Sequence, residues 1–282
     1  MSLPSINTGL HPLIEDDDQL DALKEKIQRE RGFNCVHYKD KCLRRRIAVR
    51  MRARGQNTYG GYSALLDQDA TEYEMLLDAL TINVTKFFRN ADTWKTISET
   101  LLPRLFNDRR ALTRIWSAGC SSGEEPYSIA ILLHRWAEEN GRLEDLRHFR
   151  IIGTDIDRRS LESARRAEYL DLSLTETPDD VRERWFSPGS PFRLRSEARR
   201  YVSFLHHDLI SDEAERDYSL IMCRNVIIYF DREIQEKLFQ RFYDSLRPGG
   251  YLVLGKVETL LGRTRTLFQA VSNRERIFQK PV

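Results

Sequence analysis

The sequence predicts an α/β protein in which a small all-α domain precedes a mainly parallel sheet. Up to about residue 80, apolar residues recur at helical spacing, as in Leu43, Ile47 and Met51. From about residue 110, apolar β-rich segments alternate with helical ones, which is the pattern of a parallel sheet. A turn bracketed by Gly119 and Gly123 joins the first of these strands to a helix, as in ligand sites of open α/β sheets.

The pattern along the chain predicts four parts. Residues 1–18, with two prolines and an acidic cluster, are expected to be a mobile lead-in. Residues 19–85 form the helical domain, and residues 86–282 form the domain that contains the sheet. The stretch WFSPGSPFRLRSEARRY, residues 185–201, breaks the alternation and predicts a small inserted β-subdomain. The expected strands are 113–118, 149–154, 202–206, 218–223, 250–256 and 275–280.

Composition narrows the class of protein. The 282 residues carry a net charge of +2, so no global field favours nucleic acid or a membrane surface. The four cysteines include no C-x-x-C pair, and no metal site is predicted. No apolar run approaches the ~20 residues of a membrane span, and no secretory signal is present. We expect a soluble, cytoplasmic monomer that does not insert into a membrane. Nucleic acid is not the expected partner, although a basic helix described below keeps it open as an alternative.

The turn GCSSG and the acids after it suggest the kind of ligand. Glu124 and Glu125 open the next helix, with Pro126 in its first turn. These acids would repel a pyrophosphate, but they suit a cationic ligand such as S-adenosylmethionine, which carries a sulfonium and an ammonium group. Glu124 and Glu125 can also be explained without any ligand, because acidic residues at a helix N-terminus stabilise the helix.

The second strand ends in acids as well. Asp155 follows the apolar segment FRIIGT, and Asp157 lies two residues on. An acid at this position in α/β folds often binds the ribose hydroxyls of a nucleoside. Either aspartate could instead cap the following helix, so one of them can cap while the other binds.

A strongly basic helix lies in the helical domain. Between Lys39 and Arg54 there are eight Lys or Arg residues and one acid. We expect Arg46, Arg50 and Arg54 on one exposed stripe, with Arg45 and Arg52 beside it. Like charges along a helix repel one another, which favours an anionic partner over a merely solvated face. An acidic protein surface and nucleic acid both remain open at this point.

Five motifs follow one another along the chain: NVTKFFR (83–89), GCSSGEEPYSIA (119–130), GTDID (153–157), CRNVIIYFD (223–231) and LRPGGYLVLG (246–255). Together they resemble the CheR family of chemotaxis-receptor methyltransferases. The resemblance implies a Rossmann-like class I methyltransferase domain with a small inserted β-subdomain, behind an all-α N-terminal domain. It also implies methyl transfer from S-adenosylmethionine to glutamate side chains of methyl-accepting chemotaxis receptors, with S-adenosylhomocysteine as the product.

The resemblance also implies roles for single residues. Asn83, Thr85 and Arg89 would line the cofactor pocket, and Arg89 and Tyr229 are the catalytic candidates. Glu124 would hold the methionine amino group and Asp155 the ribose. The remaining cofactor contacts would come from Asp208 and Leu209 near the adenine, and from Arg224 and Asn225 after the fourth strand. The basic helix, through Arg45, Arg46, Arg50 and Arg54, would contact acidic cytoplasmic helices of the receptors.

The chain departs from the family pattern in three places. Gly255-Lys256-Val257-Glu258 stands where members often have G-H-S-E, which leaves the role of this loop open. Asp208 stands where Asn is common. The insert is short, so binding of a receptor C-terminal peptide, known for some members, is not assumed.

The chemistry is simple for a glutamate acceptor. A glutamate has a reference pKa of about 4.3, so the nucleophile is already ionised at neutral pH and needs no general base. Two other functions stay open: a methyltransferase that acts on RNA or a small molecule, and a non-catalytic module that binds cofactor or receptor.

Overall fold

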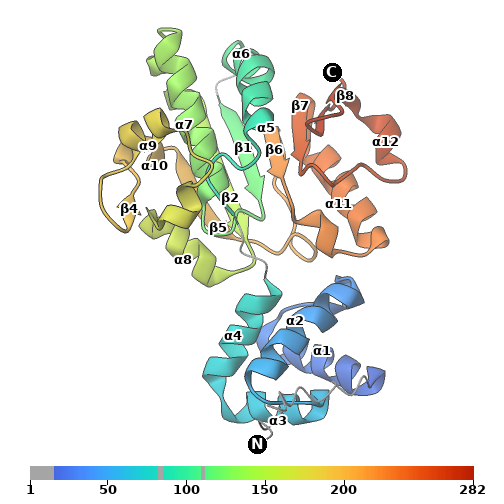
Figure 1. The fold of residues 1–282 in the computed structure, drawn as a ribbon. Coiled ribbons are helices and arrows are strands. Elements are labelled where there is room, and N and C mark those ends of the chain that lie inside the picture. Colours follow the sequence, from blue (N-terminus) through green and yellow to red (C-terminus); the bar gives the residue numbers. More distant parts are fainter. Residues whose placement is uncertain (1–15, 82–84, 109–111) are drawn as a thin grey trace, which may run out of the picture. The chain divides into compact units, whose positions relative to one another are not determined.

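The computed structural model describes residues 16–81, 85–108 and 112–282. It divides into two compact units, Met1–Ile82 and Asn83–Val282 (Figure 1). The division falls three residues before the expected boundary between residues 85 and 86. Each unit is described by itself below.

The first unit is helical, as the apolar spacing predicts. Its elements are α1 (Asp17–Arg31), η1 (Cys35–His37), α2 (Asp40–Ala53), α3 (Tyr59–Gln68) and α4 (Ala70–Leu80). Asp16 caps α1 by accepting a hydrogen bond from the backbone N–H of Gln19, and Gly32 ends it in the left-handed conformation. Leu43, Ile47 and Met51 of α2 are buried, so the predicted apolar face is the core face of this helix.

The second unit is built on a seven-stranded sheet with the order β5-β2-β1-β6-β7-β9-β8. The strands are β1 (Thr113–Ala118), β2 (Phe149–Asp155), β5 (Val202–His206), β6 (Tyr218–Cys223), β7 (Leu246–Leu254), β8 (Gln269–Ser272) and β9 (Ile277–Gln279). The first five are parallel, whereas β9 runs antiparallel to both β7 and β8. All six expected strands are present, and β8, which is exposed and only four residues long, is the one missed in this sheet.

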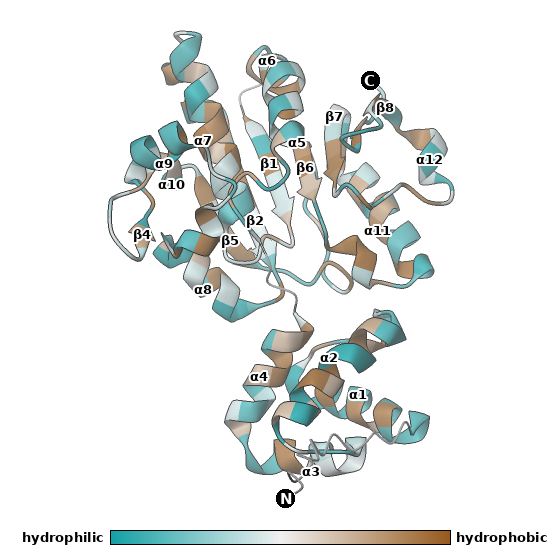
Figure 2. Ribbon diagram, in the orientation of Figure 1, coloured by the Kyte–Doolittle hydropathy of each residue, from teal (hydrophilic) through white to brown (hydrophobic). Residues whose placement is uncertain are grey.

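Helices cover the sheet. They are α5 (Ala91–Thr96), the π-helix η2 (Ile97–Leu101), α6 (Leu102–Phe106), α7 (Glu124–Glu139), η3 (Leu143–His148), α8 (Arg158–Arg166), η4 (Asp171–Leu174), α9 (Asp179–Trp185), α10 (Ser196–Arg199), η5 (Ile227–Tyr229), α11 (Arg232–Ser245) and α12 (Thr264–Leu267). In Figure 2 the central strand β6 is strongly apolar, whereas the outer helices α9 and α10 are polar. All six residues of β6 are buried, as expected for a strand covered on both faces.

The inserted segment begins earlier than predicted. Its two-stranded sheet pairs β3 (Glu168–Tyr169) with β4 (Phe192–Arg193) in antiparallel register. The expected span 185–201 therefore contains β4 and α10 but not the partner strand. A two-residue strand is too short to show a period in the sequence. None of the helices in the described ranges is long and apolar enough to cross a membrane.

Candidate cofactor site

The glycine turn is fixed from two sides at the carboxyl end of the sheet. The backbone N–H groups of Gly119 and Cys120 donate to the carbonyl of Thr154 in β2, at 2.8 and 2.9 Å. Gly119 has φ +77°, and a Cβ there would lie 2.5 Å from Val226 Cγ2 in the loop after β6. Gly123 has φ +91°, and its Cβ would lie 2.8 Å from Ala164 in α8. Only glycine therefore lets this turn pack between its neighbours.

Asp155 and Asp157 divide the two roles that the sequence left open. Asp157 caps α8 by accepting from the N–H of Arg159 at 2.9 Å and from Ser160 Oγ at 2.7 Å. Asp155 faces the glycine turn, where Oδ2 accepts from the N–H of Ser121 at 2.7 Å. Burial raises the pKa of Asp155 to about 6. Asp155 Oδ1 also accepts from the N–H of Asp157 at 2.9 Å, so each oxygen accepts one backbone N–H and keeps one lone pair for a ligand. Its binding to ribose stays a prediction.

Glu124 is a buried carboxylate with neutral partners. Its side chain accepts from Ser122 Oγ at 2.8 Å and from Ser173 Oγ at 3.1 Å. Only 2% of the residue is exposed, and burial raises the pKa of Glu124. No Lys or Arg in the described ranges forms an ion pair with it. A buried carboxylate that lacks a cation fits the ammonium group of an amino-acid ligand.

Glu125 belongs to a different network, which the sequence did not predict. Its Oε1 accepts from Ser117 Oγ at 2.8 Å, and Oε2 pairs with Arg224 Nη1 at 3.4 Å. Burial raises the pKa of Glu125, against the opposing charges of Arg224 and Arg89. The other nitrogen of Arg224, Nη2, donates to the carbonyl of Arg89 at 2.8 Å. Arg224 therefore ties β6 and α7 to the arm that carries Arg89.

This arm, residues 85–90, is held along the N-terminus of α7 and the insert. The N–H of Phe87 donates to the carbonyl of Ser173 at 2.9 Å, and the N–H of Phe88 donates to Ser128 Oγ at 3.0 Å. Tyr169 of β3 donates to the carbonyl of Ser122 at 2.9 Å, so the insert also touches the glycine turn. Arg89 is half-buried on this arm. Thr85 is half-buried at its start, and Asn83 lies outside the described residues.

The loop after β5 lies beside Asp155. The N–H of His207 donates to the Asp155 carbonyl at 3.0 Å, which places Asp208 and Leu209 next to the end of β2. The Asp208 carboxylate closes its own turn, accepting from the N–H of Ile210 and from Ser211 Oγ, both at 2.8 Å. Leu209 is 7% exposed. Of the predicted adenine contacts, Leu209 thus offers an apolar side chain, whereas Asp208 is occupied by its turn.

The loop after β6 contains Asn225 and Tyr229. Asn225 has φ +62°, and its Oδ1 is buried without a hydrogen-bond partner in the described part of the chain. Such an unsatisfied acceptor fits a site that awaits a donor. Tyr229 is half-buried in η5. The sequence did not identify Glu258 as part of this site, although its carboxylate accepts several N–H groups of the loop. The signals were an acid shortly after an apolar strand and its match to the last residue of the family pattern G-H-S-E.

The loop with the unusual pattern Gly255-Lys256-Val257-Glu258 can now be described. Lys256 forms an ion pair with Glu275, and Val257 is 72% exposed. Glu258, in contrast, is 3% exposed. The two residues that depart from the family pattern therefore point elsewhere, whereas Gly255 and Glu258 lie against the loop after β6.

The predicted exposed stripe on α2 is wrong for two of its members. Arg50 is half-buried and forms a two-pronged ion pair with Glu72 of α4, at 3.1 and 2.6 Å. Arg46 donates to the carbonyls of Ala79 and Leu80 at the end of α4, at 2.8 and 3.1 Å. The reason is that α4 packs against α2 and presents a buried acid and free carbonyls to it. Arg54 pairs with Asp69 at 2.7 Å.

A different face of α2 is exposed and cationic. Lys41, Arg45, Val49 and Arg52 are spaced four, four and three residues apart, so they share one face. All four are exposed, and the three cations form no ion pair with any residue that the structure describes. Among the residues predicted to bind substrate, Arg45 is the one on this face.

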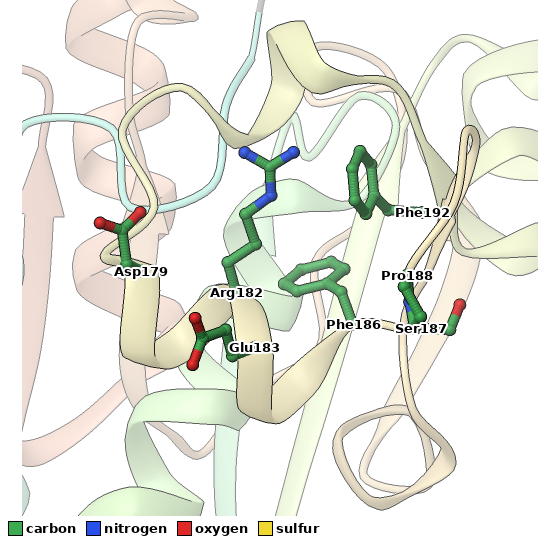
Figure 3. A pocket seen from close by; sticks show the side chains of 7 residues that line it. All are labelled: Asp179, Arg182, Glu183, Phe186, Ser187, Pro188 and Phe192. Carbon is green, nitrogen blue, oxygen red and sulfur yellow. The ribbon is translucent and has the colours of Figure 1, made fainter.

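A surface hollow lies on the insert. It has a volume of about 470 Å³ and is lined by residues of α9, β4 and the segment between them. Figure 3 shows the Arg182, Phe186 and Phe192 side chains converging in it. The Arg182 guanidinium stacks over the Phe192 ring at 4.3 Å and pairs with Asp171 at 2.5 Å. None of the residues predicted to bind the cofactor lines this hollow.

Comparison with known proteins identifies the family of the chain. Residues 18–81 match the family model "CheR methyltransferase, all-alpha domain". Residues 83–277 match "CheR methyltransferase, SAM binding domain". The chain is 36% identical over 236 residues to a chemotaxis protein methyltransferase of Listeria innocua, covering 83% of this chain and 87% of the relative. It is 31% identical over 278 residues to one of Salmonella typhimurium, covering 94% and 93%. The chain therefore belongs to the CheR methyltransferase family, with S-adenosylmethionine as its cofactor.

Proposed function

We propose that this methyltransferase esterifies glutamate side chains on the cytoplasmic helices of methyl-accepting chemotaxis receptors. Two relatives described above carry the name chemotaxis protein methyltransferase. The observation that carries the acceptor class is the cationic face of α2, with Lys41, Arg45 and Arg52 exposed and free of ion pairs within the described residues. An acidic helix is the complementary surface, and such exposed charges mainly steer encounter and orientation.

We assign each site residue to a part of the cofactor by the chemistry that its side chain offers. Glu124 supplies a buried negative charge for the ammonium group, and Asp155 supplies an acceptor for ribose hydroxyls. Leu209 would cover the adenine beside Asp208. Asn225 offers an unsatisfied acceptor, and Arg224 keeps the arm with Thr85 and Arg89 in place. Asn83 belongs to the same proposal through its motif. S-adenosylmethionine, when bound, supplies an electrophilic methyl group on its sulfonium.

The protein residues then have to orient the acceptor glutamate toward the methyl group. An ionised glutamate needs no base, because its ordinary pKa of about 4.3 lies far below neutral pH. Arg89 is proposed to hold one carboxylate oxygen and leave the other free to attack, since a guanidinium can bind a carboxylate through one or two N–H groups. Tyr229 is proposed to form the wall beside the acceptor. Correct alignment of this kind accounts for large rate effects without any proton transfer.

A methylation assay tests this function. The purified chain is incubated with radiolabelled S-adenosylmethionine and receptor cytoplasmic fragments, and the products are then treated with mild alkali. Methyl esters release labelled methanol, whereas methyl groups on nitrogen do not. The expected result is alkali-labile label on receptor, lost when the acceptor glutamates are changed to alanine.

The assay also separates the two other functions. Alkali-stable label on RNA, with none on receptor, would overturn the glutamate acceptor and favour a nucleic-acid methyltransferase. Cofactor binding without label on either acceptor would overturn the glutamate acceptor and leave a small-molecule methyltransferase or a non-catalytic binding module. Arg89→Ala should lower receptor labelling by about 10- to 100-fold, because it removes the group that orients the acceptor.

A further inference from the structure

One buried carboxylate holds four consecutive backbone N–H groups of the loop after β6. Glu258 Oε1 accepts from Val226, Ile227 and Ile228, at 3.0, 2.9 and 3.3 Å. Oε2 accepts from Asn225 at 3.0 Å and from Gly255 at 2.6 Å. No Lys or Arg in the described ranges pairs with this carboxylate, so its charge is met by backbone dipoles. Clusters of successive N–H groups of this kind are anion-binding sites.

The loop depends on this anion for its shape. Asn225 adopts φ +62°, a left-handed conformation that Asn tolerates better than most residues but that persists only where the surrounding structure holds it. Buried N–H groups without acceptors would destabilise the loop further. Gly255 admits the carboxylate, because a Cβ at this position would lie 2.7 Å from Glu258 Oε2 and 2.8 Å from the Asn225 nitrogen. The absence of a side chain at Gly255 therefore makes room for the Glu258 carboxylate.

The same loop carries the two side chains that the proposed function places beside the cofactor and the methyl acceptor. Asn225 bears the buried, unsatisfied Oδ1, and Tyr229 follows at the end of η5. Val226 packs against the glycine turn at Gly119. A shift of the loop would therefore move a proposed cofactor contact, a proposed acceptor wall and the turn together.

We propose that Glu258 is a positioning residue, which preorganises Asn225 and Tyr229 for the cofactor and the methyl acceptor by anchoring the loop Arg224–Tyr229. The proposal rests on the proposed function for the roles of these two residues. Glu258 itself has no lone pair left over for a ligand, since Oε1 accepts three backbone N–H groups and Oε2 accepts two. It acts through the loop and not on the substrate.

Replacement by a soluble anion tests the anchoring directly and needs no methyl acceptor. In Glu258→Ala, the four loop N–H groups lose their acceptor, and amide exchange at residues 224–229 should accelerate by about tenfold or more. Formate should refill the cavity and restore protection and S-adenosylhomocysteine affinity. Formamide has nearly the same shape and no charge, so it should restore neither. Glu233→Ala, a change at an exposed carboxylate of α11, serves as the control and should behave as wild type.

Kinetics tests the consequence for methyl transfer. At saturating cofactor, Glu258→Ala should lower kcat for receptor labelling by about 10- to 100-fold, with formate and not formamide recovering it. The isosteric Glu258→Gln serves if the alanine variant does not fold, and it should show the same loss of kcat with a smaller change in the KM for the receptor.

The outcomes separate the two proposals. Unchanged exchange at 224–229 in a folded variant, or equal rescue by formamide, would overturn the positioning role whatever the acceptor is. So would a loss of activity matched by uniform faster exchange over the whole unit, because that is a general loss of stability. If the wild type labels no receptor while the exchange and formate results hold, the glutamate acceptor is wrong and the anchoring of the loop by Glu258 stands.

Discussion

The ion pair between Arg50 and Glu72 gives the sharpest test of how the helical unit is held together. Glu72 is 2% exposed, and it also accepts from the Tyr62 hydroxyl at 2.6 Å. Burial raises the pKa of Glu72, but hydrogen bonds from Arg50 and Tyr62 outweigh it and leave the pKa below the ordinary 4.5. Arg50→Ala would leave this carboxylate buried without its main cation.

The expected cost follows from the geometry. Removing one partner of a buried pair costs about 3 to 5 kcal/mol. Tyr62 remains in place, and Arg54 Nε lies 3.7 Å from Glu72, so we expect the lower end of that range. In a domain of this size, each 1 kcal/mol lowers Tm by about 4–8 °C, so a loss near 3 kcal/mol corresponds to about 12–24 °C. Arg45→Ala, on the exposed face of the same helix, should change stability by less than about 0.5 kcal/mol.

Hydrogen exchange in the whole chain distinguishes the two variants. Peptides from α2 and α4 should lose protection in Arg50→Ala and keep it in Arg45→Ala, while peptides from the sheet remain unchanged in both. Equal protection of α2 and α4 in the two variants would refute the reasoning, because it would mean that the buried pair contributes no more than a surface charge. The same pair makes charge reversal at Arg50 a poor test of receptor binding.

Three further outcomes are expected. Asp155 is expected to bind ribose in its ionised form, so its pKa of about 6 means that cofactor affinity is lost as pH falls. Titration calorimetry should show S-adenosylhomocysteine binding about tenfold weaker at pH 5 than above pH 7. The pH effect should be smaller in Asp155→Asn. Gly119→Ala should destabilise the sheet unit by about 1–3 kcal/mol in chemical denaturation, and Val226→Ala in the same chain should recover part of the loss, because the added Cβ meets Val226. Charge reversal at Arg45 and Arg52 together should raise the KM for receptor severalfold at low salt and leave cofactor affinity unchanged. A fall in cofactor affinity would contradict the receptor-binding role of this face.

The sequence was most informative where local pattern and three-dimensional position coincide. The strands around Ile115 and Ile151 are visible because a parallel strand is apolar on both faces. Glu124 and Asp155 could be identified as candidates because strand ends in a parallel sheet meet at one edge. Arg50 was misplaced because its partner, Glu72, lies 22 residues away and helical periodicity says nothing about which neighbour a half-buried cation will meet.

Glu258 was missed for a related reason. The cluster of N–H groups that it fills exists only once β7 lies beside β6 and brings residue 258 to a loop that precedes it by some thirty positions. The strand β3 escaped prediction because its two residues are defined by pairing with β4 alone. Contacts between distant segments account for these misses, and spacing along the chain carries little information about them.

The contacts of the insert with the cofactor edge limit how it can be exchanged between relatives. Tyr169 holds the Ser122 carbonyl, and Ser173 touches both Glu124 and the N–H of Phe87. A chimera that replaces the whole segment from β3 to α10 would remove these supports together with any recognition surface. A transplant that begins after Glu176 would leave these contacts intact, so the rest of the insert should be exchangeable between relatives without loss of cofactor affinity.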